Sequence, residues 1–187
     1  HAGYALIGVV VAGRVETEGA VRSLGLSSVM LYLAVYAFMT LGAFTVVAML
    51  RKGGLEGDDI EDFTGLAKRQ PVAAFLMLVF MVSLAGIPPT AGFIGKFYLF
   101  MAAVQAGLAW LAVVALLFAA VSAYYYLRVV MVMYMREPQV QGGIEPRLAV
   151  SPVTTLVLAC TLAGVVLIGL YPGPLVALTT QAVLALK

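Results

Sequence analysis

Lys96 stands in the middle of a long apolar run, where an ionisable side chain is unfavourable. The run extends from about Pro88 to Ala106, so each end lies about 15 Å of helix away. A lysine stem reaches only about 6 Å, too short to carry its ammonium to the lipid headgroups of a membrane. The ammonium must therefore face protein or water, or give up its proton. A lysine that exchanges between ammonium and amine is suited to relaying protons.

Glycine and proline are concentrated just before this lysine, at Gly86, Pro88, Pro89, Gly92 and Gly95. Proline removes a backbone donor and clashes with the preceding turn. Irregular backbone at membrane depth is tolerated only against protein or a water-filled cavity, and an interrupted span beside an ionisable residue is typical of an ion pathway. The sequence therefore predicts a broken helix, with Lys96 as the main residue of a proton path. The alternative is that Lys96 only fixes a helix bend by hydrogen bonding to the freed carbonyls.

Five further polar side chains are candidates for the same pathway: His1, Tyr36, Thr40, Ser83 and Tyr124. Tyr32, Tyr36 and Thr40 recur at every fourth residue, so they share one helix face. Packing between helices is an equally good interpretation of that face. The sequence has no nucleotide-binding fingerprint, zinc spacing or cysteine cluster. We therefore expect no catalytic redox residue, no metal ligand and no cofactor bound by this chain.

The composition indicates that these residues lie in a membrane. Hydrophobic residues make up 63% of the 187 residues and the mean hydropathy is +1.06. Charged residues make up 11%, against roughly 25% in an average soluble protein. All charged residues except Lys96 and Arg128 fall in three short patches or at Lys187, which is the C-terminal residue. This layout predicts an all-α, polytopic transmembrane helix bundle and excludes a soluble enzyme, a nucleic-acid-binding protein and a disordered chain.

The apolar runs predict one partial helix and five spans. A partial helix is expected at 1–12, spans at about 24–50, 71–86, 88–106, 108–135 and 150–170, and an apolar tail at 171–187 that lies at the interface or against the bundle. A short surface helix is expected within 55–70. Since 1–12 is too short to cross a bilayer, we expect a single membrane domain fragment that starts inside a helix.

The cations do not decide the membrane orientation. Alternating the loops puts five Lys and Arg residues near each face, namely Arg14, Arg22, Arg128, Arg136 and Arg147 on one and Arg51, Lys52, Lys68, Arg69 and Lys187 on the other.

Residues 83–98, Ser-Leu-Ala-Gly-Ile-Pro-Pro-Thr-Ala-Gly-Phe-Ile-Gly-Lys-Phe-Tyr, closely resemble the broken-helix motif of the subunit N family of respiratory complex I, NADH:quinone oxidoreductase (subunit 2 in mitochondria). Four other stretches are similar to that family in the same order. They are His-Ala-Gly-Tyr (1–4), Tyr-Ala-Phe-Met-Thr-Leu-Gly-Ala-Phe (36–44), Phe-Thr-Gly-Leu-Ala-Lys-Arg-Gln-Pro (63–71) and Tyr-Tyr-Tyr-Leu-Arg-Val (124–129).

The resemblance implies the second half of an antiporter-like inverted-repeat fold of fourteen helices. The chain would cover the last part of helix nine through helix fourteen, and the twelfth would be the broken helix. Lys96 matches the family's position that is taken to gate the outward half of a proton channel. His1 and the polar faces are candidate members of the hydrated central axis.

The function implied is a proton-translocating membrane subunit that couples electron transfer from NADH to quinone to proton pumping. NADH, FMN, iron–sulfur clusters and quinone would lie in or near partner subunits. The partners would be other membrane subunits of complex I, including antiporter-like paralogues, and the lipid bilayer. The expected location is the bacterial plasma membrane, or the inner mitochondrial membrane if the protein is organellar. The alternatives are a subunit of an Mrp-type Na⁺/H⁺ antiporter and a structural bridging subunit without its own proton path.

Overall fold

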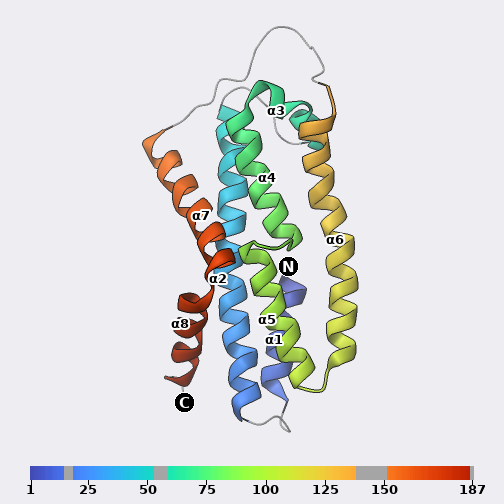
Figure 1. Ribbon diagram of the computed structural model, residues 1–187, viewed down its shortest axis with the longest axis vertical. Coiled ribbons are helices and arrows are strands. Elements are labelled where there is room, and N and C mark those ends of the chain that lie inside the picture. The colour runs from blue at the N-terminus through green and yellow to red at the C-terminus, as the bar shows by residue number, and fades with distance from the viewer. Residues whose placement is uncertain (15–18, 53–58, 138–150, 186–187) are drawn as a thin grey trace.

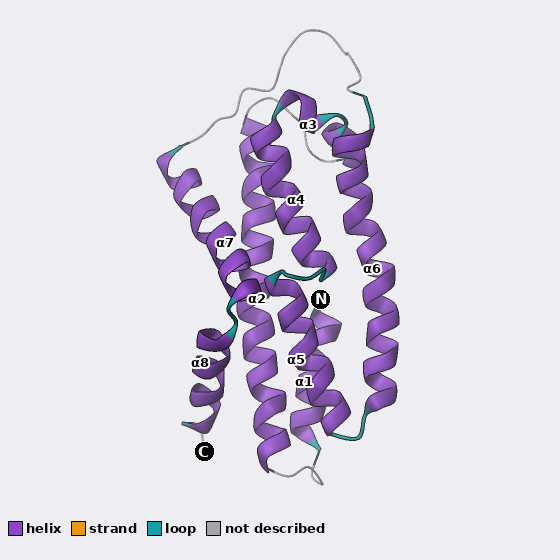
Figure 2. Cartoon of the chain, viewed as in Figure 1, coloured by secondary structure: helices purple, strands orange, loops and turns teal. Residues whose placement is uncertain are grey.

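The computed structural model describes residues 1–14, 19–52, 59–137 and 151–185, which are helical with no strand among them (Figure 2). The elements are α1 (Ala2–Gly13), α2 (Gly19–Lys52), the 3-10 helix η1 (Ile60–Phe63), α3 (Leu66–Arg69), α4 (Pro71–Ala85), α5 (Ala91–Gln105), α6 (Ala109–Met135), α7 (Pro152–Leu170) and α8 (Gly173–Leu184). By length and composition, α2, α6 and α7 can each cross a membrane. The prediction of an all-α transmembrane bundle is confirmed.

Helices α4 and α5 form one interrupted passage. Each has 15 residues, or about 22 Å, which is shorter than the roughly 30 Å hydrocarbon core. They follow one another end to end beside the 34-residue α2 (Figure 1). The expectation of separate spans at 71–86 and 88–106 is therefore corrected. Hydropathy alone could not show this, because it measures the lengths of apolar runs and not how they stack.

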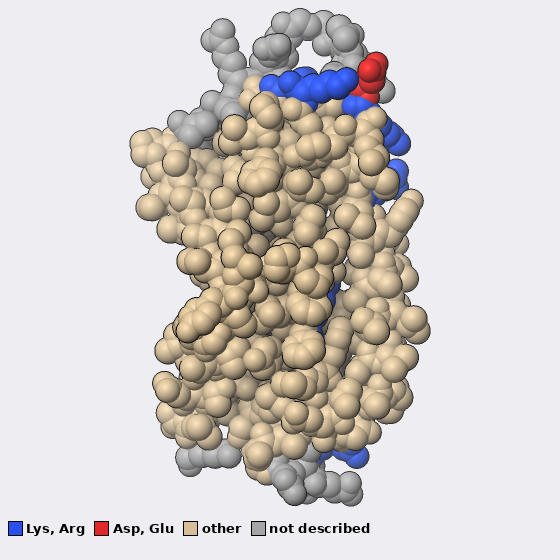
Figure 3. Space-filling view, viewed as in Figure 1, with Lys and Arg blue, Asp and Glu red and all other residues tan. Residues whose placement is uncertain are grey.

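This correction changes which charged residues share an end of the molecule. Because α4 and α5 together make one passage, the C-terminal end of α6 lies beside α3. There Arg136 pairs with Glu61, and Lys68 pairs with Glu137. Arg51, Lys68, Arg69 and Arg136 are thus at one end, and Arg14 and Arg22 at the other. Cationic side chains gather at both ends of the space-filling view (Figure 3). The five-against-five sorting was wrong, and Arg147 and Lys187 lie outside the described residues.

A second interrupted passage is made by α7 and α8. Tyr171 and Pro172 separate the two helices, and α8 continues toward the end of the bundle at which α2 begins (Figure 1). α8 packs against α2 and buries Thr179 and Val183, so the described part of the tail lies against the bundle. The surface helix expected within 55–70 is seen from residue 59 onward as η1 and α3, which Thr64 and Gly65 separate. Residues 55–58 lie outside the described part.

The core is organised around α2. At its C-terminal half, Met39, Val46 and Phe80 belong to a buried cluster shared with α4. At its N-terminal half, Tyr32 packs with Leu99 of α5 and Val11 of α1. The outer faces of α6 and α7 expose large apolar side chains such as Trp110, Leu117 and Leu167. Such faces suit contact with lipid rather than water.

Candidate functional site at the helix break

The break begins with a glycine that ends α4. Gly86 has a φ of 85°, a left-handed conformation that glycine adopts without a steric penalty. The Gly86 amide donates to Ser83 O at 2.9 Å, and the Ile87 amide donates to Val82 O at 3.2 Å. This is the hydrogen-bond pattern of a Schellman C-cap. It satisfies the carbonyls of Val82 and Ser83 and leaves those of Leu84 and Ala85 to find other partners.

Lys96 supplies those partners from α5. Its side chain is 4% exposed, and its Nζ donates to Leu84 O at 3.0 Å and to Ala85 O at 2.9 Å. The last four carbonyls of α4 are therefore all hydrogen bonded. This geometry is the one that the bend-fixing alternative describes. Among the described residues, no carboxylate lies within ion-pairing distance of Lys96.

Close backbone packing holds the two halves of the broken helix together. A Cβ added at Gly92 would collide with the backbone of Ser83, so only glycine fits there. The Gly92 amide donates to Ser83 Oγ at 3.1 Å, and that hydroxyl donates to Met39 Sδ at 2.9 Å. Gly95 lies against Tyr32, where an added Cβ would be 3.1 Å from the ring. The glycines and Ser83 therefore place α5 closely against α4 and α2.

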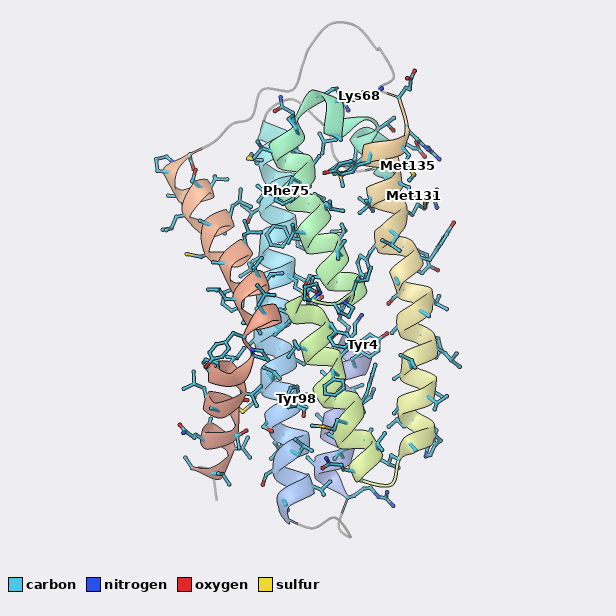
Figure 4. The ribbon with its side chains drawn as sticks, in the orientation of Figure 1. Tyr4, Lys68, Phe75, Tyr98, Met131 and Met135 are labelled. Atoms are coloured by element: carbon cyan, nitrogen blue, oxygen red, sulfur yellow. The ribbon has the colours of Figure 1, made fainter. Side chains whose placement is uncertain are left out.

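Lys96 also faces Tyr4 and a cavity. Its Nζ lies 5.3 Å from the centroid of the Tyr4 ring, within the range of a cation–π contact. The cavity has a volume of about 420 Å³ and separates the break and α5 from α6. Phe93, Phe97 and Phe100 line it from α5, and Ala119 and Ala123 are among its lining residues from α6. Figure 4 shows Tyr4 beside the break, reaching toward this part of the molecule.

His1 lies at the centre of a group of aromatic side chains. Its Nδ1 is 2.6 Å from Tyr32 Oη of α2, and its Nε2 is 2.6 Å from Tyr126 Oη of α6. The imidazole stacks on Tyr36 with the ring centroids 4.7 Å apart, and it meets Tyr4 edge to face at 6.2 Å. Both ring nitrogens are thus held by phenol hydroxyls from two different helices.

A second cavity adjoins this aromatic group. It has a volume of about 380 Å³, lies between α1 and α6, and is lined by His1, Tyr4, Phe118 and Ser122 among others. Lys96 and His1 therefore each border a cavity whose other lining residues are mostly apolar, and Tyr4 contacts both side chains.

The structure brings together some of the candidates and not others. Lys96, His1 and Tyr36 are connected through Tyr4 and Tyr32, and Ser83 lies at the break itself. Thr40 instead donates to Tyr36 O at 2.7 Å, within its own helix. Tyr124 is 59% exposed and contacts the Tyr125 ring, so it is not part of the cluster.

Sequence reasoning missed Tyr4 and Tyr126 as members of the cluster. Tyr126 follows Ala112, Ala115, Ala119 and Ser122 at helical spacing on the face of α6 that turns toward the bundle. That stripe of small residues marks the inward face of α6. It could have identified Tyr126, not Tyr124, as the one of the three consecutive tyrosines that faces the bundle. The contact of Tyr4 with Lys96 depends on how α1 and α5 pack, and no local pattern reports it.

Comparison with known proteins gives related sequences over nearly the whole chain. Subunit N 2 of the NADH-quinone oxidoreductase of Rhizobium meliloti is 48% identical over 182 residues, covering 97% of this chain and 35% of that protein. The corresponding subunit N of Bdellovibrio bacteriovorus is 42% identical, covering 98% of this chain and 36% of that protein. The chain thus spans about a third of the length of these relatives.

A solved structure and a family model agree with these relatives. A chain of respiratory complex I from Thermus thermophilus, solved with bound aureothin, superposes with a TM-score of 0.66 at 24% identity, covering 94% of this chain and 43% of that chain. This match shows that the two chains share a fold. Residues 1–122 match the family model described as NADH:quinone oxidoreductase/Mrp antiporter, TM. The chain is therefore an integral membrane protein that belongs to the NADH:quinone oxidoreductase/Mrp antiporter transmembrane family.

Proposed function

We propose that the full-length protein is the proton-translocating membrane subunit N of an NADH:quinone oxidoreductase, and that this chain forms a proton path around Lys96. The observation that carries the proposal is the buried Lys96 ammonium at a helix break, bordering a cavity and facing an aromatic cluster. The relatives named subunit N support the assignment to this complex.

The contacts of Lys96 allow its proton to be exchanged without undoing the break. Leu84 O and Ala85 O take two of the three N–H donors of the ammonium. A neutral amine still has two N–H groups, so it keeps both hydrogen bonds after the third proton has left. That third proton is available on the side of Tyr4 and the cavity. Lys96 can thus bind the helix end and carry a proton at the same time.

The His1 cluster continues the path toward α2 and α6. A neutral imidazole donates from one nitrogen and accepts at the other, and here both nitrogens meet a tyrosine hydroxyl. Passing a proton through the ring reverses which of Tyr32 and Tyr126 receives the hydrogen bond. No hydrogen bond joins Lys96 to His1 among the described residues, and Tyr4 meets both through its ring. A proton passing between the two side chains would therefore need bridging water.

The redox chemistry belongs elsewhere in the proposed complex. Within the part of the chain that the structure describes, no group of three or more His, Cys, Asp or Glu side chains could hold a metal ion. The single cysteine, Cys160, is exposed on α7. These residues do not fit an iron–sulfur cluster, which needs several thiolates. We assign NADH, FMN, the clusters and quinone to partner subunits, and derive no redox step through this chain.

The setting of the subunit follows from the same proposal. Its partners would be other complex I membrane subunits, including antiporter-like paralogues, in the bacterial plasma membrane. The described cations are more numerous at the α3 end, where Arg51, Lys68, Arg69 and Arg136 lie, than at the end with Arg14 and Arg22. By the positive-inside rule, the α3 end is cytoplasmic.

The test is to replace Lys96 in the full-length subunit within the assembled complex. Lys96→Gln retains N–H donors for the helix end but cannot carry a proton, whereas Lys96→Ala removes both functions. We expect both variants to lower the number of protons translocated per electron in proteoliposomes, and only Ala to weaken assembly as well. Normal pumping by an assembled Lys96→Gln complex would contradict the proposal and leave Lys96 as a structural cap.

The family description also covers Mrp antiporters, so the transported ion needs its own measurement. The same proteoliposomes, assayed with Na⁺ or with a large organic cation in its place, separate the two functions. Redox-driven proton movement that is independent of Na⁺ supports the oxidoreductase. Proton movement that requires a Na⁺ gradient and no NADH would favour the antiporter.

A further inference from the structure

The two interrupted passages touch each other at their interruptions. Gly169, in the last turn of α7, lies directly against the α4–α5 loop. A Cβ built at Gly169 would collide with Pro89 O and would lie 2.8 Å from both the carbonyl carbon and the Cα of Thr90. All three of these are backbone atoms, so no side-chain rotation could make room. The contact therefore requires glycine at position 169 as long as the backbone of Pro89 and Thr90 stays in place.

The α7–α8 joint is itself anchored to the bundle. α7 ends at Leu170, and the Tyr171 amide still donates to Leu167 O at 2.7 Å. Val165 is fully buried, and Ile168 and Val176 pack against the same core cluster as Met39 and Ala91. Packing of α7 and α8 against the core cluster therefore holds the joint in place, and with it the Gly169 backbone that contacts Pro89 and Thr90.

A short series of close contacts leads from Gly169 to Lys96. Thr90 precedes Ala91, which is fully buried, and Gly92, whose backbone lies against Ser83. Ser83 is followed by Leu84 and Ala85, whose carbonyls bind Lys96 Nζ. On the other side of the loop, an added Cβ at Gly86 would lie 3.0 Å from Lys96 Nζ. Displacing the loop would therefore displace the acceptors of the lysine.

We propose that Gly169 is a positioning residue, through which the α7–α8 joint holds the 86–90 loop and so orients the carbonyls that bind Lys96. The proposal rests on the proposed function of Lys96 only for its effect on pumping. Its structural part, that the joint restrains the loop, stands independently. It gives α7 and α8 a role in the proton path although they contribute no ionisable side chain to it.

The experiment uses the full-length subunit in the assembled complex, with Gly169→Ala as the main variant. Gly173→Ala is the matched control, because Gly173 lies just beyond the same joint and an added Cβ there meets nothing within 4 Å. Amide hydrogen exchange of peptides covering residues 84–96 reports the loop, and protons per electron report function. We expect exchange in this segment to be about tenfold faster in Gly169→Ala, with a lower proton yield. Gly173→Ala should match the wild type in both measurements.

A second variant covers the case in which Gly169→Ala does not assemble. Pro172→Ala loosens the joint without adding an atom at the contact, and it should also speed exchange in residues 84–96 while leaving the segment around Trp110 unchanged. Unchanged exchange in 84–96 in an assembled variant would overturn the proposal. Faster exchange with a normal proton yield, in a complex whose Lys96→Gln variant fails to pump, would overturn only the effect of Gly169 on pumping. If instead Lys96→Gln pumps normally, the proposed function fails, and the exchange data still decide whether the joint restrains the loop.

Discussion

The two interpretations of Lys96, proton relay and fixing of a helix bend, are compatible with each other. The proton-relay interpretation and the bend-fixing interpretation both follow from a lysine placed after helix breakers. The structure shows the hydrogen bonds that the second one requires, and the donor count of an amine shows that they do not exclude the first. One side chain could therefore both cap α4 and carry a proton. A variant that keeps the N–H donors but cannot exchange a proton separates the two roles.

Tyr126 provides a residue-scale prediction. Tyr126→Phe removes the hydroxyl that meets His1 Nε2 and leaves one imidazole nitrogen without this partner. Loss of one such hydrogen bond costs about 1 kcal/mol of stability, so the complex should assemble. We expect a proton-pumping rate at least about fivefold lower, measured in proteoliposomes at a constant NADH oxidation rate.

The control for Tyr126 lies next to it in the sequence. Tyr125 is 61% exposed, and its ring contacts Tyr124 on the outer face of α6. Tyr125→Phe should leave pumping unchanged. Equal rates in the Tyr126→Phe and wild-type complexes would remove Tyr126 from the path.

At the scale of the element, the helix break could be predicted from glycine and proline, whereas its packing could not. Gly86, Pro88 and Pro89 stop a helix wherever they occur together, because their backbone preferences are local. That α4 and α5 continue one passage depends on close approaches such as Gly92 against Ser83, which form only in the folded bundle. The same distinction explains why Tyr36 was found from spacing and Tyr4 was not.

Gly86 allows a prediction that separates backbone strain from contact with Lys96. Gly86 has a φ of 85° and Gly107 a φ of 72°, so alanine is strained at both. Each substitution should destabilise the complex by about 1–2 kcal/mol. An added Cβ at Gly86 also lies 3.0 Å from Lys96 Cδ and Nζ, while one at Gly107 meets nothing within 4 Å. We therefore expect Gly86→Ala to lower the proton yield and Gly107→Ala to retain it.

Thermal unfolding of the purified complex checks the shared loss of stability, and the proteoliposome assay checks the difference in function. A similar proton yield in both variants would show that the contact between Gly86 and Lys96 is unimportant.

At the scale of the whole molecule, the charges could be sorted correctly only after the passages were counted. Treating α4 and α5 as two crossings reverses the side of every later loop, which is how Arg136 was assigned away from Lys68. The ion pair of Arg136 with Glu61 and the hydrogen bond from the Gly65 amide to Val132 O tie the end of α6 to η1 and α3. Counting one crossing too many therefore hid the unequal distribution of Lys and Arg between the two ends, which indicates the orientation.

The restored signal gives a prediction at the same scale. Lys68 is exposed at the end that we propose to be cytoplasmic. A Lys68→Cys variant should react with a membrane-impermeant thiol reagent in inverted membrane vesicles and not in right-side-out vesicles. Lys68→Ala gives the background from Cys160, and the opposite labelling pattern would reverse the orientation.

The C-terminal end of α4, whose last carbonyls bind Lys96, determines which changes can alter the electrostatic environment of that side chain. A helix C-terminus carries about half a negative charge in its peptide dipoles, and α4 directs that end at the buried ammonium. The counter-charge of Lys96 within the described residues is therefore built from backbone, not from a carboxylate. Peptide groups do not titrate, and no single side-chain substitution can delete them. The backbone counter-charge of Lys96 thus depends on the geometry of the break, and a movement of one helix end relative to the other would change it.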